Sequence, residues 1–132
     1  MSETPGIRIE RLDHLVLTVR DIEASTEFYS RTLGMEAVTF GAGRRALRFG
    51  RQKINLHPAD ALPGRVARHP TPGSGDLCFI AGSPIDEVIA HLRRVGVAIE
   101  EGPVTRSGAL GPITSVYFRD PDQNLIEVSR YE

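Results

Sequence analysis

The chain repeats one order of strand and helix signals about 62 residues apart, and this duplication constrains its fold more than any other feature. His14 begins the apolar segment HLVLTV, and Asp76 begins DLCFIA 62 positions later. Asp21 and Ser83 then stand where a helix would start, again 62 positions apart. A repeat of this length indicates two copies of one supersecondary unit.

Each copy predicts one strand, one helix and three further strands. In the first copy, residues from Ile9 to Val19 alternate in polarity as a strand does, Asp21 is a good helix N-cap, and Gly34 is a helix stop. The three later strands are MEAVTF, RRALRF and KINLHP. In the second copy, residues 76–81 form the strand, a capping hydroxyl and a proline start the helix, and glycine ends it. Its later strands are VAIEEG, TSVYFR and LIEVS.

The predicted fold class is therefore α+β, with two βαβββ modules that pack together. A chain of 132 residues with 40% hydrophobic content is one domain with a real core. We expect module one at about 7–57 and module two at about 76–130. The connector between them, about 58–75, holds four prolines and three glycines and predicts a long loop that passes near a binding site.

Charge and composition exclude several classes of partner. The net charge is -1, with 16 Lys and Arg against 17 Asp and Glu, which argues against a nucleic acid or an anionic membrane. No apolar run approaches the length of a membrane span, and the N-terminus lacks the pattern of a signal peptide. A single cysteine excludes an internal disulfide and favours the reducing cytoplasm.

The strand patterns separate an apolar face from a polar face. One helix per module covers only one side of the strands, and the apolar side should pack beneath it. That side comprises Leu15, Leu17, Val19, Ile54, Leu56, Leu77, Phe79, Ala81, Ile126 and Val128. The opposite side carries His14, Asn55, His57, Asp76, Glu127 and Ser129. Because unpaired buried polar groups are costly, this second side should line a concavity.

A concave sheet that gathers imidazole and carboxylate side chains suits a divalent metal ion such as iron, zinc, nickel or manganese. The repeat points to His14, Asp76 and Glu127 as ligands, with Asn55 at the fourth matched position. His57 lies two residues beyond Asn55 and is an alternative ligand if the strand slides or bulges. Glu127 would also serve as a catalytic base.

Structural interpretations remain open for the same residues. His14 would be bonded locally at a strand start, and Glu127 would pair with an arginine such as Arg48 or Arg119. Asp76 would be a strand-entry residue, and His57 would simply end a strand. Other residues have other expected roles. Substrate would contact Asn55, Arg48 and Tyr117. We expect Cys78 to be a small buried thiol, His69 and His91 to lie at the surface, and RDPDQN to form a hairpin turn.

Two long segments support a resemblance to a known family. DHLVLTVRDIEASTEFYSRTLGM resembles the opening of vicinal oxygen chelate (VOC) proteins, the glyoxalase, bleomycin resistance and extradiol dioxygenase superfamily, and VYFRDPDQNLIEVS resembles their ending. Within the superfamily, the chain looks most similar to small glyoxalase-domain proteins of unassigned activity. The resemblance implies two βαβββ modules that pair into an open cup of mixed sheet. It also implies a metal held by the first and last strands, and substrates that chelate it through neighbouring oxygens.

By position, His14 matches the first family ligand and Glu127 the last. Asp76 stands where the family commonly has histidine, and Asn55 where glyoxalase lyases commonly have glutamate. The resemblance thus predicts a metal-dependent enzyme, either a glyoxalase-like lyase or isomerase or a ring-cleaving dioxygenase, acting on a small molecule. The alternative is a metal-free protein of the bleomycin resistance kind that sequesters a ligand. A homodimer is expected, with each cup inside one chain or with modules exchanged between chains.

Overall fold

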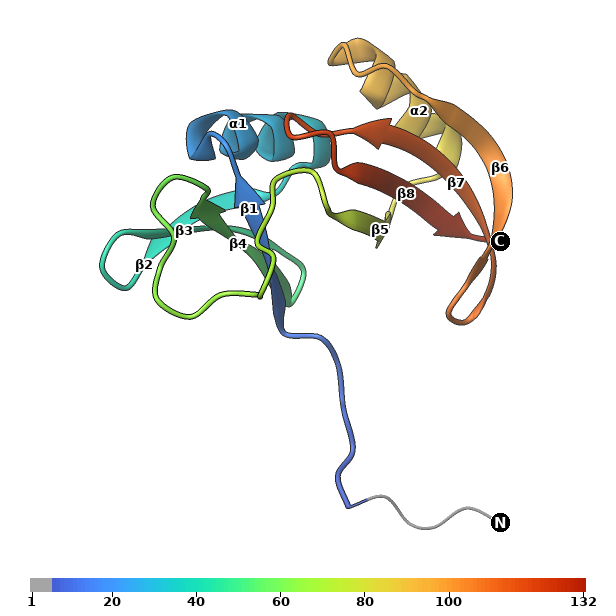
Figure 1. Cartoon of the computed structure of the whole chain (residues 1–132). Coiled ribbons are helices and arrows are strands. Elements are labelled where there is room, and N and C mark those ends of the chain that lie inside the picture. The colour runs from blue at the N-terminus through green and yellow to red at the C-terminus, as the bar shows by residue number, and fades with distance from the viewer. Residues whose placement is uncertain (1–5) are drawn as a thin grey trace.

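The computed structural model describes residues 6–132, which form two modules of one helix and four strands each (Figure 1). Module one contains β1 (His14–Val19), α1 (Ile22–Leu33), β2 (Glu36–Phe40), β3 (Arg44–Phe49) and β4 (Gln52–Pro58). Module two contains β5 (Asp76–Ile80), α2 (Ile85–Arg94), β6 (Glu101–Gly108), β7 (Gly111–Arg119) and β8 (Leu125–Tyr131). The duplicated βαβββ order and the predicted α+β class are confirmed.

The two modules share one sheet topology and one strand register. The strand orders are β1-β4-β3-β2 and β5-β8-β7-β6, and each sheet begins with a parallel pair. Val16 faces Asn55 across the first pair, and Cys78 faces Glu127 across the second. Each of these strand partners lies two residues beyond His14 or Asp76. The residues matched in the sequence repeat therefore occupy equivalent places in the two sheets.

Local signals explain where the helices begin and end. The Asp21 carboxylate accepts a hydrogen bond from the Ala24 amide at 3.1 Å, and Gly34 ends α1 with a φ of 67°. The prediction that Ser83 caps α2 is wrong: Pro84 is the N-cap, and no side chain caps this end. Pro84 has an extended ψ of 150°, so the helix begins one residue after it. Within residues 6–132, neither helix has the length and apolar character needed to cross a bilayer.

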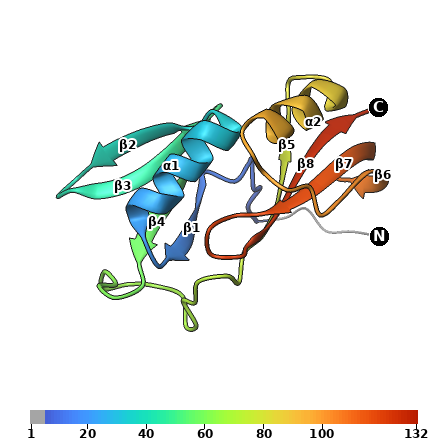
Figure 2. The ribbon, with the colours of Figure 1, turned by 90° about the horizontal axis from the view of Figure 1, so that it is seen from above.

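The apolar faces of both sheets meet the helices in one core. Seen from above, both helices lie over the sheets (Figure 2). Phe28 packs against Phe118 with ring centroids 6.2 Å apart, and Phe49 packs edge-on to Phe79 at 5.4 Å. Both contacts join module one to module two. The predicted apolar face is confirmed, since all of its members are buried or packed against this core.

Two predicted strand boundaries are wrong. Ile9 does not belong to the first strand: the chain from Gly6 to Asp13 leaves the body as an arm, and Ile9 is 81% exposed (Figure 1). The sixth strand begins at Glu101, near the end of the predicted VAIEEG segment, rather than at Val97, and it continues to Gly108. Val97 and Ile99 alternate because they pack against the core, and not because that segment pairs as a strand.

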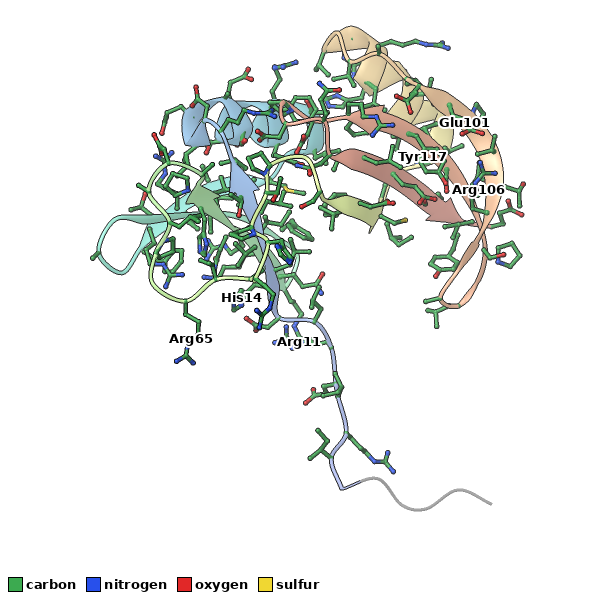
Figure 3. The ribbon with its side chains drawn as sticks, viewed as in Figure 1. Arg11, His14, Arg65, Glu101, Arg106 and Tyr117 are labelled. Carbon is green, nitrogen blue, oxygen red and sulfur yellow. The ribbon has the colours of Figure 1, made fainter. Side chains whose placement is uncertain are left out.

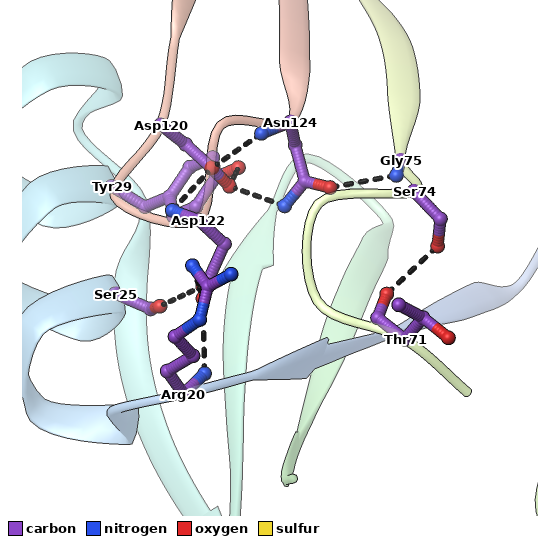
Figure 4. A network of polar contacts seen from close by, with 9 residues as sticks. All are labelled: Arg20, Ser25, Tyr29, Thr71, Ser74, Gly75, Asp120, Asp122 and Asn124. Atoms are coloured by element: carbon purple, nitrogen blue, oxygen red, sulfur yellow. Dashed lines mark hydrogen bonds and ion pairs between the residues drawn. The ribbon is translucent and has the colours of Figure 1, made fainter.

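The RDPDQN segment is the expected turn, but three of its polar side chains, those of Asp120, Asp122 and Asn124, are buried. The Asp120 carboxylate accepts from the Tyr29 hydroxyl at 2.6 Å and from the Asn124 side-chain amide at 2.8 Å (Figure 4). The Asp122 carboxylate accepts from the Arg20 backbone amide at 3.0 Å. The side-chain oxygen of Asn124, Oδ1, accepts from the Gly75 backbone amide at 2.6 Å. The β7–β8 turn therefore anchors module two to α1, to the end of β1 and to the connector.

Candidate functional site

The polar face of the first sheet begins with an oriented imidazole. His14 is exposed near the start of β1, and its Nδ1 lies 2.9 Å from the Asp13 carboxylate (Figure 3). Because a carboxylate only accepts, Nδ1 donates, and Nε2 is left with its lone pair available. The hydrogen bond from His14 is the main cause that lowers the pKa of Asp13. The local bond expected for a strand-start histidine is present, and a carboxylate–histidine pair is also typical of metal ligands.

Deeper on the same face, two polar side chains are buried without protein partners. Asn55 is 4% exposed and His57 is 6% exposed. Among residues 6–132, neither the Asn55 side-chain oxygen nor either His57 ring nitrogen has a hydrogen-bond partner. Burial, followed by the nearby Arg44 guanidinium, lowers the pKa of His57. Thr18 faces His57, so the imidazole lies four residues beyond the level of His14, about 13 Å along the strands.

The polar face of the second sheet centres on Glu127. Its Oε2 accepts a hydrogen bond from Ser129 Oγ at 3.3 Å, and Ser129 in turn lies 2.6 Å from Ser115 Oγ. Cys78 Sγ lies 3.3 Å from Ser129 Oγ, and burial chiefly raises the pKa of this thiol. The Cys78 residue is nevertheless exposed on the polar face, so the expectation of a buried thiol is wrong. The Ser129 hydroxyl, itself held by Ser115, therefore positions the Glu127 carboxylate.

Tyr117 and Arg106 flank Glu127 and form a second polar group on this face. Arg106 Nε donates to the Tyr117 hydroxyl at 3.0 Å, and Arg106 also bonds to Glu101 at 3.0 Å (Figure 3). Burial raises the pKa of Tyr117, and the negative charge of Glu127 acts in the same direction. The sequence reading missed Arg106 because it ended the sixth strand at Gly102. Had the predicted strand continued past Gly102 through Val104, it would have included Arg106.

The other predicted residues have their own contacts. Arg48 Nη2 bonds to Glu36 at 2.6 Å, and both side chains are more than half exposed. Arg119 bonds to Glu100 at 3.0 Å. The interpretation of Glu127 as a partner of Arg48 or Arg119 is therefore wrong. Asp76 is exposed at the start of β5.

The two remaining histidines, which were expected at the surface, lie outside the polar faces. His69 is exposed in the connector, as expected. His91 is only partly buried, and its Nε2 lies 2.9 Å from the Thr32 carbonyl oxygen, so this residue helps to join α2 to α1.

Within one chain, the predicted metal ligands do not converge. Across residues 6–132, no three His, Cys, Asp or Glu side chains form a group that could hold a metal ion. His57 lines a cavity of about 520 Å³ beside the connector, whereas Glu127, Tyr117 and Arg106 line another of about 400 Å³. Another hollow, of about 670 Å³, lies between the end of α1 and α2, and none of the predicted site residues lines it.

Most of the chain matches a known protein family. The model of the glyoxalase/bleomycin resistance protein/dioxygenase superfamily matches residues 11–128. The chain belongs to this superfamily. The match spans both modules, so the duplication seen in the sequence is the VOC duplication.

Close relatives of this VOC domain include virulence protein STM3117 from Salmonella typhimurium, which is 54% identical over 93% of this chain and 85% of its own length. The crystal structure of STM3117 has a TM-score of 0.94 and covers 96% of this chain and all of the other. Glyoxalase domain-containing protein RDO1 from Mycosarcoma maydis is 50% identical over 96% of this chain and 71% of its own length. Lactoylglutathione lyase from Agrobacterium tumefaciens is 26% identical, with a TM-score of 0.72 over 93% of this chain and 95% of its own.

The donor chemistry on each polar face fits a VOC-type divalent metal ion, although one chain does not assemble the site. His14 has an available ring nitrogen and an orienting carboxylate, and Glu127 is a carboxylate fixed by a hydroxyl. Imidazole and carboxylate donors suit iron, zinc, nickel and manganese. Each face thus carries donor types that such an ion accepts.

Proposed function

We propose that this protein is a divalent-metal-dependent VOC enzyme that acts on a small molecule carrying two neighbouring oxygens. His14 from one copy of the chain and Glu127 from a second copy hold the metal. Asp76 is the third candidate ligand. The register places His57 about 13 Å beyond the level of His14, so we leave it outside the metal set.

The proposal rests on a conflict between two observations on the single chain. The two sheets place ligand-type residues at matched positions, since Asn55 pairs with Val16 as Glu127 pairs with Cys78. The described part of one chain nevertheless gathers no group of three such side chains. The buried β7–β8 turn fixes the modules to one another, so a hinge within the chain does not resolve the conflict. A second copy does.

Charge and exposed apolar surface support a homodimer that exchanges modules. Residues 7–57 carry nine Lys and Arg against six Asp and Glu, whereas residues 76–130 carry five against eight. Module one of one copy therefore attracts module two of the other. The N-terminal arm exposes Ile7 at 76%, Ile9 at 81% and Leu12 at 57%, which is apolar surface that a second copy would cover.

The residues of the site have separable roles. A bound divalent cation would act as a Lewis acid towards two neighbouring substrate oxygens. The Tyr117 hydroxyl, which accepts from Arg106, would donate its own proton in a hydrogen bond to a substrate oxygen or to Glu127. Asn55 would offer its unpartnered side-chain oxygen to a substrate hydroxyl, and the Glu127 carboxylate would serve as a metal ligand or accept a proton as base. Arg48, on the same face, would contact a negatively charged part of the substrate.

Metal analysis of purified protein tests this function. The wild type should hold about one divalent ion per chain, and His14→Ala and Glu127→Ala should each lower metal affinity by at least roughly a hundredfold, since each removes a ligand. Arg48→Ala, on the same sheet as His14 but outside the ligand set, should retain the metal. Unchanged metal content in both ligand variants would end the assignment.

A metal-free sequestering protein is the second candidate. The carboxamide of Asn55 is a weak metal ligand, and Asp76 stands exposed where the family commonly has histidine. This function predicts that ligand binding survives a chelator and the His14→Ala change. Loss of ligand binding on chelation would exclude it and favour the enzyme.

A further inference from the structure

A second cavity, separate from the Glu127 face, lies between the open edge of β1 and the connector. Its volume is about 520 Å³, which is within the usual range for small-molecule pockets. Its walls are mainly apolar, with Leu15 and Leu17 from β1, Val66 and Pro70 from the connector, and Leu77 from β5. The connector therefore encloses one side of a pocket of useful size.

His57 is the polar residue in this wall that the fold leaves unexplained. It is 6% exposed, and neither ring nitrogen has a hydrogen-bond partner among residues 6–132. A buried polar group without a partner destabilises the folded state unless a ligand supplies the missing bond. His57 lines the cavity, as does Thr18, its partner across the strands. The cavity thus presents a nitrogen donor or acceptor to an apolar space.

The surroundings select the chemistry of the occupant. No Asp, Glu or Lys is among the residues that line the cavity. Its other basic residues are Arg65, whose side chain points away from the body into solvent (Figure 3), and His69, which is exposed. A charged molecule would enter an apolar space without a buried counter-ion, which is costly. A neutral imidazole offers one donor and one acceptor, and a hydroxyl group matches either.

We propose that this cavity binds a neutral, largely apolar molecule bearing a hydroxyl group, with that hydroxyl hydrogen-bonded to His57. Phenols and cyclic alcohols share this chemistry. The site lies about 13 Å along the strands from the level of His14, and it requires no metal ion. It is therefore independent of the proposed metal-dependent reaction.

Calorimetric titration of the chelator-treated protein tests the proposal, using phenol and cyclohexanol as probes. Toluene lacks the hydroxyl and benzoate carries a charge, so both should bind at least tenfold more weakly than phenol. If phenol binds more tightly than cyclohexanol, the cavity favours an aromatic ligand; if cyclohexanol binds more tightly, it favours an aliphatic one. Because metal is removed, the result does not depend on whether the proposed enzyme function holds.

Two substitutions at one position separate the hydroxyl contact from mere filling of space. His57→Phe keeps a ring but removes both nitrogens, and should weaken phenol binding at least tenfold without weakening toluene binding. His57→Gln retains a donor and an acceptor and should restore part of the phenol affinity. Arg68→Ala, an exposed connector change outside the cavity wall, should bind phenol as the wild type does.

His57→Phe should also fold normally, because it removes two unpartnered buried nitrogens, and thermal melting checks this. In the wild type, phenol should shift the ring-nitrogen NMR signals of His57. Equal binding of phenol and toluene, full phenol affinity in folded His57→Phe, or no probe binding by the wild type would overturn the proposal.

Discussion

The two polar faces have the same architecture and opposite chemistry. The face of module one carries an imidazole at the start of β1 and an amide on β4, whereas that of module two carries a carboxylate at each equivalent place. Module one is net positive and module two is net negative. Duplication has therefore preserved the backbone register while the side chains have diverged into complementary halves. Across residues 6–132, one chain brings no three ligand-type side chains together.

The turns between the last two strands differ just as clearly. In module one, Gly50 and Arg51 form a short exposed turn, whereas the β7–β8 turn of module two buries Asp120, Asp122 and Asn124 against module one. Of the two turns, only the second contacts the other module through buried hydrogen bonds. This difference gives the largest expected effect of a single substitution.

Asp120→Ala should destabilise the protein by roughly 3–5 kcal/mol, because several buried donors lose their shared acceptor. The Tyr29 hydroxyl, two backbone amides and the Asn124 side chain all donate to this carboxylate. Urea unfolding measures the change. Arg51→Ala, in the matched exposed turn, should change the free energy of unfolding by less than about 0.5 kcal/mol. Equal effects in the two turns would contradict the asymmetry.

The same anchor predicts how stability depends on alkaline pH. Burial first, and then the charge of Asp120, raise the pKa of Tyr29 well above its ordinary value of 10.0. The folded state thus keeps a proton that the unfolded chain releases near pH 10. The stability supplied by Tyr29 should be fully present below that pH and should fall as pH rises above it.

Tyr29→Phe provides the matched test of this pH dependence. It should cost about 1–3 kcal/mol at neutral pH, because the Asp120 carboxylate loses a buried donor. It should also flatten the loss of stability above pH 10, as measured by urea unfolding across the pH range. An unchanged alkaline slope in this variant would assign the loss to other groups.

Asp13→Asn should weaken metal binding about 10- to 100-fold, because a neutral amide replaces the charged carboxylate that accepts from His14 and raises its basicity as a ligand. The matched change is Glu10→Gln, which alters an exposed carboxylate on the arm. Metal titration by calorimetry compares the two variants with the wild type. Equal affinity for all three proteins would show that Asp13 does not position the imidazole.

The charge difference between modules predicts a smaller effect, on assembly. Raising sodium chloride from 0.05 to 0.5 M should weaken the dimer by roughly three- to tenfold, because salt screens attraction between module one of one copy and module two of the other. Sedimentation velocity measures the dissociation constant. A dimer that tightens with salt would indicate an apolar interface instead.

Much of the fold is predictable from the sequence because the same strand and helix signals occur in both modules. The His14 and Asp76 strands, the Asp21 cap, the Gly34 stop and the long connector are all in their predicted places. The errors arise where tertiary packing overrides a local pattern. Val97 and Ile99 alternate for the core rather than for a strand, and Ile9 belongs to an arm.

The site is less predictable than the fold. Periodicity indicates that His14 and Glu127 lie on polar faces, but it cannot indicate that these faces belong to separate sheets that do not converge within the described chain. It also cannot reveal that His57 is buried without a partner, because that depends on how the connector folds back over β1. Arg106 was missed because of a strand boundary rather than for lack of a chemical signal.

Metal content of a mixed dimer tests the shared site most directly. One chain carries His14→Ala and the other Glu127→Ala, each with a different affinity tag, and the heterodimer is purified through both tags. One of its two sites then lacks both ligands, while the other has His14 from one chain and Glu127 from the other. The account predicts one tightly bound metal ion per mixed dimer and none in either parent dimer. No recovery of metal in the mixed dimer would contradict a site built from two copies.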